Sequence, residues 1–430
     1  SFNGPVYPSS YGLAVDSSGN AYLNLNDADT GLSYIIKVNG QTGNIIWSTQ
    51  LNDNGDIGYN AKIDPYSGHL IVNGTFWDGN EALAYAAKVD IDTGAFIWQR
   101  SIGIDPVDTP STGLGVGTDG TITLSGFFSY YGGAPGWIVQ LNNDGTYKNG
   151  YTISSGSNYS SVGDAISSKD GHVYIAGAYQ DNGNIEYGYV AKFNPSTGMF
   201  DWVNNIGPGA GCIDVGISLA EDPTGNVYVT GIAGNNIIGS MSVGSFTSDG
   251  QERWQYQLGA PTISTPVFPG SFWGGNSSNQ GYGSYGSNID YRDGLLTFGV
   301  SVMAGNMSPF PTWPLVLTVL ADGTHFDFNG DMPEVASTST DWQITTATLT
   351  AVALGGDPVG PGPLTVSTNY GGISTSSVTI SYSDPTTEYT FTTTTVISTP
   401  YTWQFKDDGS LALPNSGVVT DANNQGLSLV

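Results

Sequence analysis

KVDIDTGAFIWQR, residues 88–100, contains a frame that occurs three times in the chain. The same frame is present in KVNGQTGNIIWST, residues 37–49, and in KFNPSTGMFDWVN, residues 192–204. Each copy has a lysine, an apolar residue, a polar turn that ends in Thr-Gly, and a tryptophan four residues after the glycine. A turn and an indole that recur at fixed spacing indicate a repeated structural unit.

A second frame, centred on a turn glycine, occurs six times and defines the period of the repeat. Its copies are VDSSGNAYLNL from residue 15, IDPYSGHLIVNG from 63, VGTDGTITLSG from 116, SSKDGHVYIAG from 167, EDPTGNVYVTG from 221 and DYRDGLLTFGV from 290. The turn glycines are Gly19, Gly68, Gly120, Gly171, Gly225 and Gly294, separated by 49, 52, 51, 54 and 69 residues. Intervals near fifty residues, the last with an insertion, indicate tandem supersecondary units.

Each unit is predicted to contain four β-strands. In the fourth unit, VGDAIS, HVYIAGAY, YVAKFN and MFDWVNNI are separated by polar turns that contain glycine. Val, Ile, Tyr and Phe favour strands, and glycine supplies the positive φ angles that tight hairpins need. No segment shows the 3.6-residue period of an amphipathic helix. A four-stranded antiparallel sheet that recurs at this period is typical of a β-propeller blade.

We therefore predict an all-β fold, a β-propeller of six or seven four-stranded blades with a small C-terminal β appendage. Residues 1–335 contain six clear blades. Residues 336–400 are rich in threonine and serine. Their alternating segments either complete a seventh blade, which the strand count favours, or form a separate β-module on a Pro-Gly hinge. Residues 401–430 form a further short β motif.

The Thr-Gly-Trp frame resembles the tryptophan-docking motif of quinoprotein-type propellers. The Asp-x-x-Gly-Asn-x-Tyr-Val-x-Gly frame is also similar to the repeat of bacterial seven-bladed propellers. The resemblance implies that the indole of one blade packs against a neighbouring blade, a structural role. The matching indoles are Trp47, Trp98, Trp202 and Trp254. The third and sixth units carry Tyr147 and Phe326 near this position, where docking is expected to be weaker or different.

The sequence predicts no enzymatic activity and no quinone cofactor. Enzymatic quinoproteins resembling this repeat usually place a vicinal disulfide over the cofactor ring, and Cys212 is the single cysteine of this chain. Gly-x-Ser-x-Gly, His-Glu-x-x-His and phosphate-loop motifs are absent from the sequence. The resemblance therefore covers blade architecture, roughly residues 10–330, and not the chemistry.

The last thirty residues resemble a short repeat of marine cyanophage virion proteins. In that repeat, an aromatic-x-Phe strand and an Asp-Gly turn precede a Leu-x-Leu-Pro-x-x-Gly strand. The matching residues are Trp403, Phe405, Asp408, Gly409, Leu411, Leu413, Pro414 and Gly417. Lys406 stands where the family more often has glycine. The resemblance implies a place in a tail, fibre or other virion attachment, and we expect the chain to be part of a longer protein.

Charge restricts the partners that the chain can bind. The sequence has 10 Lys and Arg against 37 Asp and Glu, a net charge of −27. Such a charge repels nucleic acid and anionic membranes, and no apolar run has membrane-spanning length. We therefore expect no nucleic acid and no membrane insertion.

One segment has the composition of a recognition loop. PGSFWGGNSSNQGYGSYGSN, residues 269–288, lengthens the last repeat interval and places rigid aromatic residues among Gly, Ser and Asn. The candidate ligand-binding residues are Phe272, Trp273, Tyr282 and Tyr285. The segment either recognises a ligand or packs across the open face of the propeller. FFSYYGGAPGW, residues 127–137, is a shorter instance with the same two readings.

Two acidic turns have the Asp-x-Asp-x-Gly spacing of a propeller calcium loop. They are DADTG, with Asp27 and Asp29, and DIDTG, with Asp90 and Asp92. Calcium prefers clustered carboxylate and carbonyl oxygens, but the third oxygen ligand expected in such a loop is missing. We therefore predict no metal, with Ca²⁺ at these aspartates as the alternative.

Two functions remain as hypotheses. The first is a non-catalytic virion module, structural or recognising a host-surface glycan or protein, with other virion proteins as partners and a virion or extracellular location. The second is a secreted propeller enzyme that acts on polysaccharide. The cyanophage-like terminus and the scarcity of histidine favour the first.

Overall fold

The computed structural model describes the chain in separate stretches. They are residues 8–27, 32–51, 57–77, 81–103, 109–128, 135–154, 160–180, 186–206, 215–235, 238–259, 289–303, 312–324, 336–339, 350–353, 359–361, 404–405, 411–412 and 418–419. Within these stretches every regular element is a β-strand. The chain divides into two compact units, residues 1–378 and 379–430.

The first unit is a six-bladed β-propeller, which confirms the predicted fold class. Blades 1 to 3 consist of β1 (Pro8–Val15), β2 (Ala21–Asp27), β3 (Leu32–Val38), β4 (Ile45–Gln50); β5 (Ile57–Ile63), β6 (Leu70–Trp77), β7 (Ala82–Val89), β8 (Phe96–Ile102); and β9 (Ser111–Val116), β10 (Ile122–Phe127), β11 (Gly136–Leu141), β12 (Tyr147–Ser154). Blades 4 to 6 consist of β13 (Ser160–Ser167), β14 (Val173–Gln180), β15 (Glu186–Asn194), β16 (Met199–Ile206); β17 (Val215–Glu221), β18 (Val227–Asn235), β19 (Ile238–Phe246), β20 (Glu252–Gly259); and β21 (Ile289–Arg292), β22 (Leu295–Met303), β23 (Thr312–Leu320). Each blade is an antiparallel meander, and blade 6 has three described strands.

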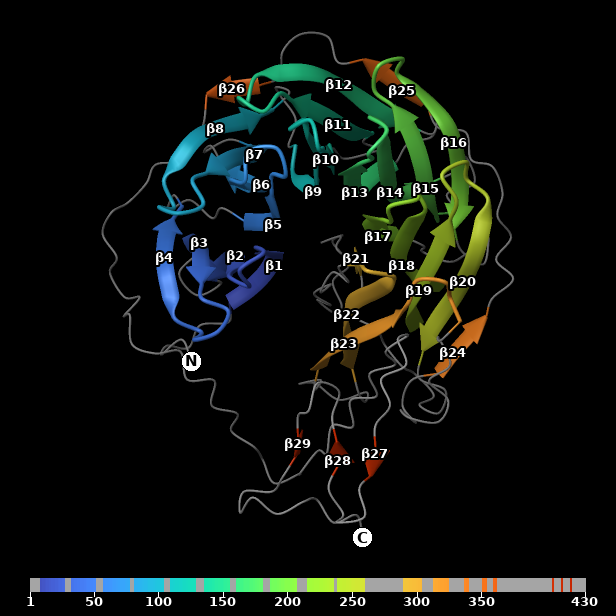
Figure 1. Cartoon of the computed structure of the whole chain (residues 1–430). Helices are drawn as coiled ribbons and strands as arrows, with labels where there is room; N and C mark the ends of the chain where they lie inside the picture. The colour runs from blue at the N-terminus through green and yellow to red at the C-terminus, as the bar shows by residue number, and fades with distance from the viewer. Residues whose placement is uncertain are drawn as a thin grey trace. The chain divides into compact units, whose positions relative to one another are not determined.

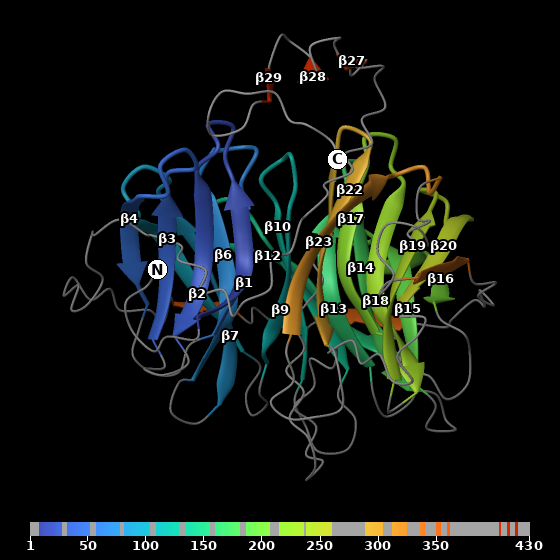
Figure 2. The same ribbon diagram turned by 90° about the horizontal axis from the view of Figure 1, so that it is seen from below.

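The first strand of each blade lies innermost, and the blades follow one another around a common centre (Figures 1 and 2). Inner strands of successive blades pack closely, because glycines leave room for the neighbouring backbone. A Cβ on Gly12 of β1 would lie 2.6 Å from the carbonyl carbon of Asn60 in β5, and one on Gly113 of β9 would lie 2.9 Å from Cα of Asp164 in β13. Glycine at these positions thus sets the spacing of the blades.

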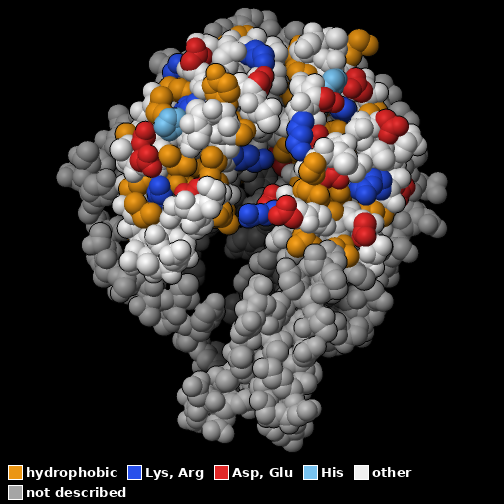
Figure 3. All heavy atoms as spheres, in the orientation of Figure 1, with side chains coloured by type: hydrophobic (Ala, Val, Ile, Leu, Met, Phe, Trp, Pro, Cys, Tyr) orange, Lys and Arg blue, Asp and Glu red, His pale blue; other side chains and the backbone are white. Residues whose placement is uncertain are grey.

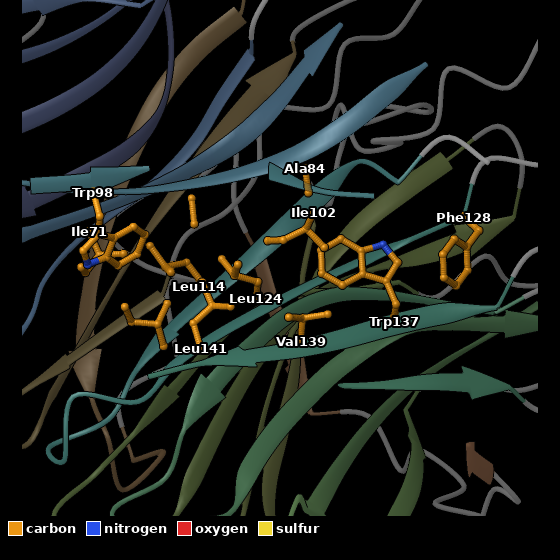
Figure 4. Packing of buried hydrophobic residues seen from close by; sticks show 12 residues of the cluster. Ile71, Ala84, Trp98, Ile102, Leu114, Leu124, Phe128, Trp137, Val139 and Leu141 are labelled. Atoms are coloured by element: carbon orange, nitrogen blue, oxygen red, sulfur yellow. The ribbon is translucent and has the colours of Figure 1, made fainter. Parts of the chain in front are cut away.

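The hydrophobic core is distributed between the blades rather than inside one central layer. One cluster joins Ile71, Trp98 and Ile102 of blade 2 to Leu114 and Trp137 of blade 3 (Figure 4). Comparable clusters join blades 1 and 2, blades 3 and 4, and blades 4 and 5. Because blades 2, 3 and 4 have such clusters on both faces, their middle strands read as nearly continuous apolar runs.

Indoles connect four pairs of consecutive blades at equivalent positions. The Trp98 Nε1–H donates to the carbonyl oxygen of Asn143 in the next blade, at 3.0 Å. The corresponding bonds are Trp47 to Ile91 at 3.1 Å, Trp202 to Ser248 at 3.1 Å and Trp254 to Ala321 at 3.2 Å. Each acceptor lies in the turn that follows the third strand of the next blade, so the frame is both donor and receiver of this contact.

Two structural features require glycine in each turn that accepts an indole hydrogen bond. Gly145 has φ +79°, a left-handed backbone that a side chain would strain. A Cβ there would also lie 2.8 Å from the Trp98 ring. Gly94 receives Trp47, Gly250 receives Trp202 and Gly323 receives Trp254 in the same way.

Blade 3 reaches blade 4 through Tyr151. Its hydroxyl donates to the carbonyl oxygen of Pro195 at 2.6 Å, and its ring lies against Gly198. The other tyrosine, Tyr147, packs against the cluster between blades 2 and 3. Phe326, the candidate in blade 6, lies outside the described residues.

The lysine of the repeated frame also reaches the next blade. Lys88 Nζ lies 2.6 Å from Oδ1 of Asn143 and 3.0 Å from Oδ2 of Asp64, and both charged side chains are buried. Asn143 in turn donates to the same Asp64 oxygen at 2.7 Å. Burial acts to raise the pKa of Asp64, but hydrogen bonds from Ser67, Asn143 and Lys88 hold it below its ordinary value.

The Asp-x-x-Gly-Asn-x-Tyr frame is a turn organised by its aspartate. In blade 5, the Asp222 carboxylate accepts hydrogen bonds from the backbone N–H of Thr224 at 2.8 Å and of Asn226 at 2.9 Å. It also accepts the Asn226 amide at 2.8 Å and the Tyr228 hydroxyl at 3.0 Å. Asp16 of blade 1 bonds to Asn20 and Tyr22 in the same way. In both blades, the asparagine and the tyrosine of the frame bond to its aspartate.

The aspartates of these turns are expected to make the stability of the fold sensitive to acid. Burial acts to raise the pKa of Asp222, but hydrogen bonds from Thr224, Asn226 and Tyr228 outweigh it and lower the pKa. A carboxyl whose folded-state pKa is lowered stabilises the fold above its unfolded pKa, about 4, and this contribution is lost as pH falls below that value. We expect the urea midpoint to fall between about pH 5 and pH 2 and to fall less steeply in Asp222→Asn. Equal slopes in the two proteins would contradict the assignment.

Three strands of the Thr/Ser-rich segment lie on the outer edges of blades. β24 (Ala336–Ser339) pairs with β20 of blade 5, β25 (Thr350–Ala353) with β12 of blade 3, and β26 (Val359–Pro361) with β8 of blade 2. We call these three strands the strap. The other residues of 336–400, predicted either to complete a seventh blade or to form a β-module, lie outside the described residues.

The second unit contains a three-stranded antiparallel sheet. Its strands are β27 (Gln404–Phe405), β28 (Leu411–Ala412) and β29 (Val418–Val419). β27 and β28 include Phe405 and Leu411, two residues of the phage-like motif. The small C-terminal sheet agrees with the predicted β appendage.

Candidate functional site

Strand directions divide the propeller into two faces. We call the turn face the one formed by the hairpins 16–20, 39–44 and their equivalents in the other blades. We call the connection face the opposite one, where second and fourth strands end and the next strands begin. Since every blade has the same strand order, residue segments attached to these ends share one face.

The four ligand-binding candidates Phe272, Trp273, Tyr282 and Tyr285 lie outside the described residues. The described strand ends that flank their segment are Gly259 of β20 and Ile289 of β21, both at the connection face. The shorter aromatic segment joins Phe127 of β10 to Gly136 of β11, also at this face. The topology therefore attaches both segments to the same face.

Two aromatics of the shorter segment are packing residues. Trp137 is 1% exposed and Phe128 is 7% exposed, and both belong to the cluster between blades 2 and 3 (Figure 4). The Trp137 Nε1–H donates to the carbonyl oxygen of Phe127 at 3.1 Å. For these two side chains, packing and not recognition is the structural role.

Trp77 is an exposed aromatic that the sequence analysis did not single out. It is the last residue of β6, at the connection face, and 46% of it is exposed, whereas the preceding Phe76 is buried. An indole with one face in solvent can stack on a sugar ring or enter a protein interface. The signal in the sequence was an indole at the end of an apolar run, directly before the turn DGNE.

The connection face has acidic but no basic side chains in its joining segments. All 10 Lys and Arg of the sequence lie outside the segments that join strand ends there. The acidic residues of those segments are Asp29, Asp53, Asp56, Asp78, Glu81, Asp105, Asp108, Asp181 and Asp214. Such a face repels anionic polymers and suits a neutral or basic partner.

The turn face carries mixed charges that are largely paired with one another (Figure 3). His172 lies between two carboxylates, with Nδ1 3.0 Å from Asp170 and Nε2 3.2 Å from Asp201. Lys192 Nζ lies 2.6 Å from the same Asp170. Burial acts to raise the pKa of Asp170, but hydrogen bonds from Lys192 and neighbours lower it strongly. These contacts stabilise the turns of blade 4.

An inner-strand aspartate forms a polar link that sequence reasoning missed. Asp164 of β13 is 8% exposed and accepts the backbone N–H of Leu219 in β17 at 2.9 Å. Burial raises the pKa of Asp164, against the opposing charge of Lys62 on β5. The position was recognisable as a charged residue in the middle of an otherwise small and apolar strand, VGDAIS.

The calcium candidates are partly occupied by local bonds. The Asp90 carboxylate accepts the backbone N–H and the hydroxyl of Thr93, at 2.8 and 2.7 Å. Asp92 is exposed, 4.0 Å from Lys37 Nζ. Asp27 ends β2, and Asp29 lies outside the described residues. Among the side chains that the structure describes, no three His, Cys, Asp or Glu residues are grouped as metal ligands.

Comparison with solved structures shows structural similarity to other chains. No protein-family model matches the sequence, and no curated protein matches it. The structure is similar to a crystal structure of polysaccharide lyase Uly1, with a TM-score of 0.45 and 11% identity over 74% of this chain and 91% of that chain. A similarity of this size establishes no shared activity. The described stretches contain no helix that could span a membrane.

Proposed function

We propose that the chain is a non-catalytic phage virion module that binds a neutral glycan or a protein of the host surface through its connection face. The observation that carries the proposal is the placement of the aromatic segments. Exposed Trp77 and the strand ends that hold residues 260–288 and 129–134 share this face. Loops on one end of a rigid propeller are its usual binding positions.

The charge distribution supports the same face. Several described lysines and arginines contact the next blade, as Lys88 does through Asn143 at 2.6 Å and Arg100 does through the carbonyl oxygen of Gly145 at 2.8 Å. The joining segments of the connection face have only acidic charges. Aromatic faces with polar edges suit pyranose rings, and the negative charge disfavours anionic lipopolysaccharide at long range.

The virion location rests on the C-terminal motif. The resemblance to marine cyanophage virion proteins covers residues 402–430, and the second unit contains three short strands within this stretch. A small sheet that follows a propeller on the same chain suits a joint between the recognition module and other virion proteins.

Adsorption to host cells tests this function. We expect Trp77→Ser to weaken binding of the purified chain at least about tenfold, because exposed aromatic anchors contribute most of the energy of such contacts. Trp273→Ser combined with Tyr282→Ser should abolish adsorption. The matched control is Tyr66→Ser, an aromatic of the same blade that is 65% exposed in a turn of the opposite face.

Two results would contradict the proposal. Undiminished adsorption by both Trp77→Ser and the double variant would mean that the connection face is not the binding surface. Release of reducing ends from algal polysaccharide by the purified chain would instead favour the secreted propeller enzyme.

A further inference from the structure

The strap binds the outer edges of three blades in an order opposite to the chain. It passes from blade 5 to blade 3 and then to blade 2, as the paired strands β20, β12 and β8 show (Figure 1). In blade 3, Thr152 is directly opposite Val352 and Ser154 is opposite Thr350. The strap is therefore a set of added strands and not a sheet of its own.

An outer blade edge is a place where another strand can add. A fourth strand without a further neighbour presents unpaired backbone N–H and C=O groups, which template pairing with another chain. The strap strands are three or four residues long, and β26 ends at Pro361 within the sequence DPVGPGP. Short strands and proline block further addition at an edge. The strap thus covers three edges and ends the pairing there.

The linkers of the strap keep it on its own propeller in dilute solution. Residues 340–349 join β24 to β25, and residues 354–358 join β25 to β26. Linkers of this length give an effective local concentration on the order of millimolar. A strand from another molecule competes only when its own concentration approaches that value.

We propose that the outer edges of β8, β12 and β20 are strand-acceptor sites, which the strap fills as an intramolecular cap, and that the competing ligand is the strap of a second copy of this chain. The second copy follows from the register, because its strap offers the same backbone and side chains at each paired position. Crowding of copies then converts capped monomers into molecules joined by exchanged strands.

Disulfide trapping tests both parts of the proposal. In a Cys212→Ser background, Thr152→Cys combined with Val352→Cys should form an intramolecular disulfide at monomer mass, because directly opposed strand residues have Cβ atoms about 4.5–5.5 Å apart. Failure to form this disulfide would overturn the cap. Mixing the two single-cysteine chains should give crosslinked dimers whose yield rises with concentration, above the level of either chain alone. No such excess up to about 1 mM would overturn exchange with a second copy.

A destabilised strap gives an independent measurement. Ala351→Pro combined with Val352→Pro removes the N–H that donates to β12, whichever of the two it is, and Ala351→Ser combined with Val352→Thr keeps both. We expect amide exchange in residues 151–154 to become at least about tenfold faster in the proline variant alone. That variant should also bind a peptide of residues 347–356, and a scrambled peptide should not bind. Unchanged exchange, or equal binding of both peptides, would overturn the proposal; if the variant does not fold, disulfide trapping decides.

Discussion

Replacing Trp98 with Ala is expected to lower the free energy of unfolding by about 3–5 kcal/mol. Trp98 is 9% exposed and belongs to the cluster between blades 2 and 3. Truncation removes the ring that lies against Gly145 and leaves a cavity between the blades. It also removes the hydrogen bond to Asn143, a net loss of about 1 kcal/mol.

The neighbouring residue supplies the control for this measurement. Ile97 is 48% exposed on the other side of β8. Ile97→Ala should therefore change the free energy of unfolding, measured by urea denaturation, by less than about 0.5 kcal/mol. Trp98→Phe keeps an aromatic ring but loses the N–H donor. Its free energy of unfolding should lie between those of Trp98→Ala and Ile97→Ala. An unchanged midpoint in Trp98→Ala would show that the indole does not hold the blades together.

Replacing Lys88 with Met is expected to destabilise the protein by about 3–5 kcal/mol, because the variant leaves the charge of Asp64 buried without a cation. Lys88 and Asp64 are both buried, with Nζ and Oδ2 3.0 Å apart. The matched control is Lys148→Met, whose partner Asp119 is 3.9 Å away and whose side chain is 39% exposed. That exposed pair should contribute less than about 1 kcal/mol.

The pH dependence distinguishes a lost charge from lost packing. In the native protein, Lys88 is among the donors that hold the pKa of Asp64 below its ordinary value. Without it, the pKa of Asp64 rises and the folded variant takes up a proton more readily, so its deficit relative to the native protein should shrink as pH falls through about 4. A deficit that is constant over pH would show that packing of the lysine stem, and not its charge, is responsible.

Blade architecture was predictable because it depends on the spacing of residues that are close together in the sequence. The turn glycines, the Asp-Gly turns and the recurring Trp each depend on residues a few positions apart, so a single repeat contains the signal. Tyr151 was not predictable by the same rule, because it lies two positions beyond Asn149, the residue that pairs with Gln140 as Trp98 pairs with Lys88.

Contacts between distant segments were beyond the sequence pattern. The pairing of Lys88 with Asn143 joins residues of different repeats, and the strap joins residue 352 to residue 152. The side of the propeller on which Trp77 lies follows from strand direction within the assembled ring. These features depend on which surfaces face one another after folding, which spacing along the chain does not encode.

The docking contacts have a mechanical consequence. Because each blade is held to its neighbours, a pulling force acts on every boundary between blades, and the weakest boundary opens first. The boundary between blades 3 and 4 differs from the four indole contacts, because a smaller phenol ring, Tyr151, makes it. β25 pairs with β12 on one side of that boundary and touches β16 on the other. The added strand β25 therefore bridges the boundary between blades 3 and 4 and reinforces it against a pulling force.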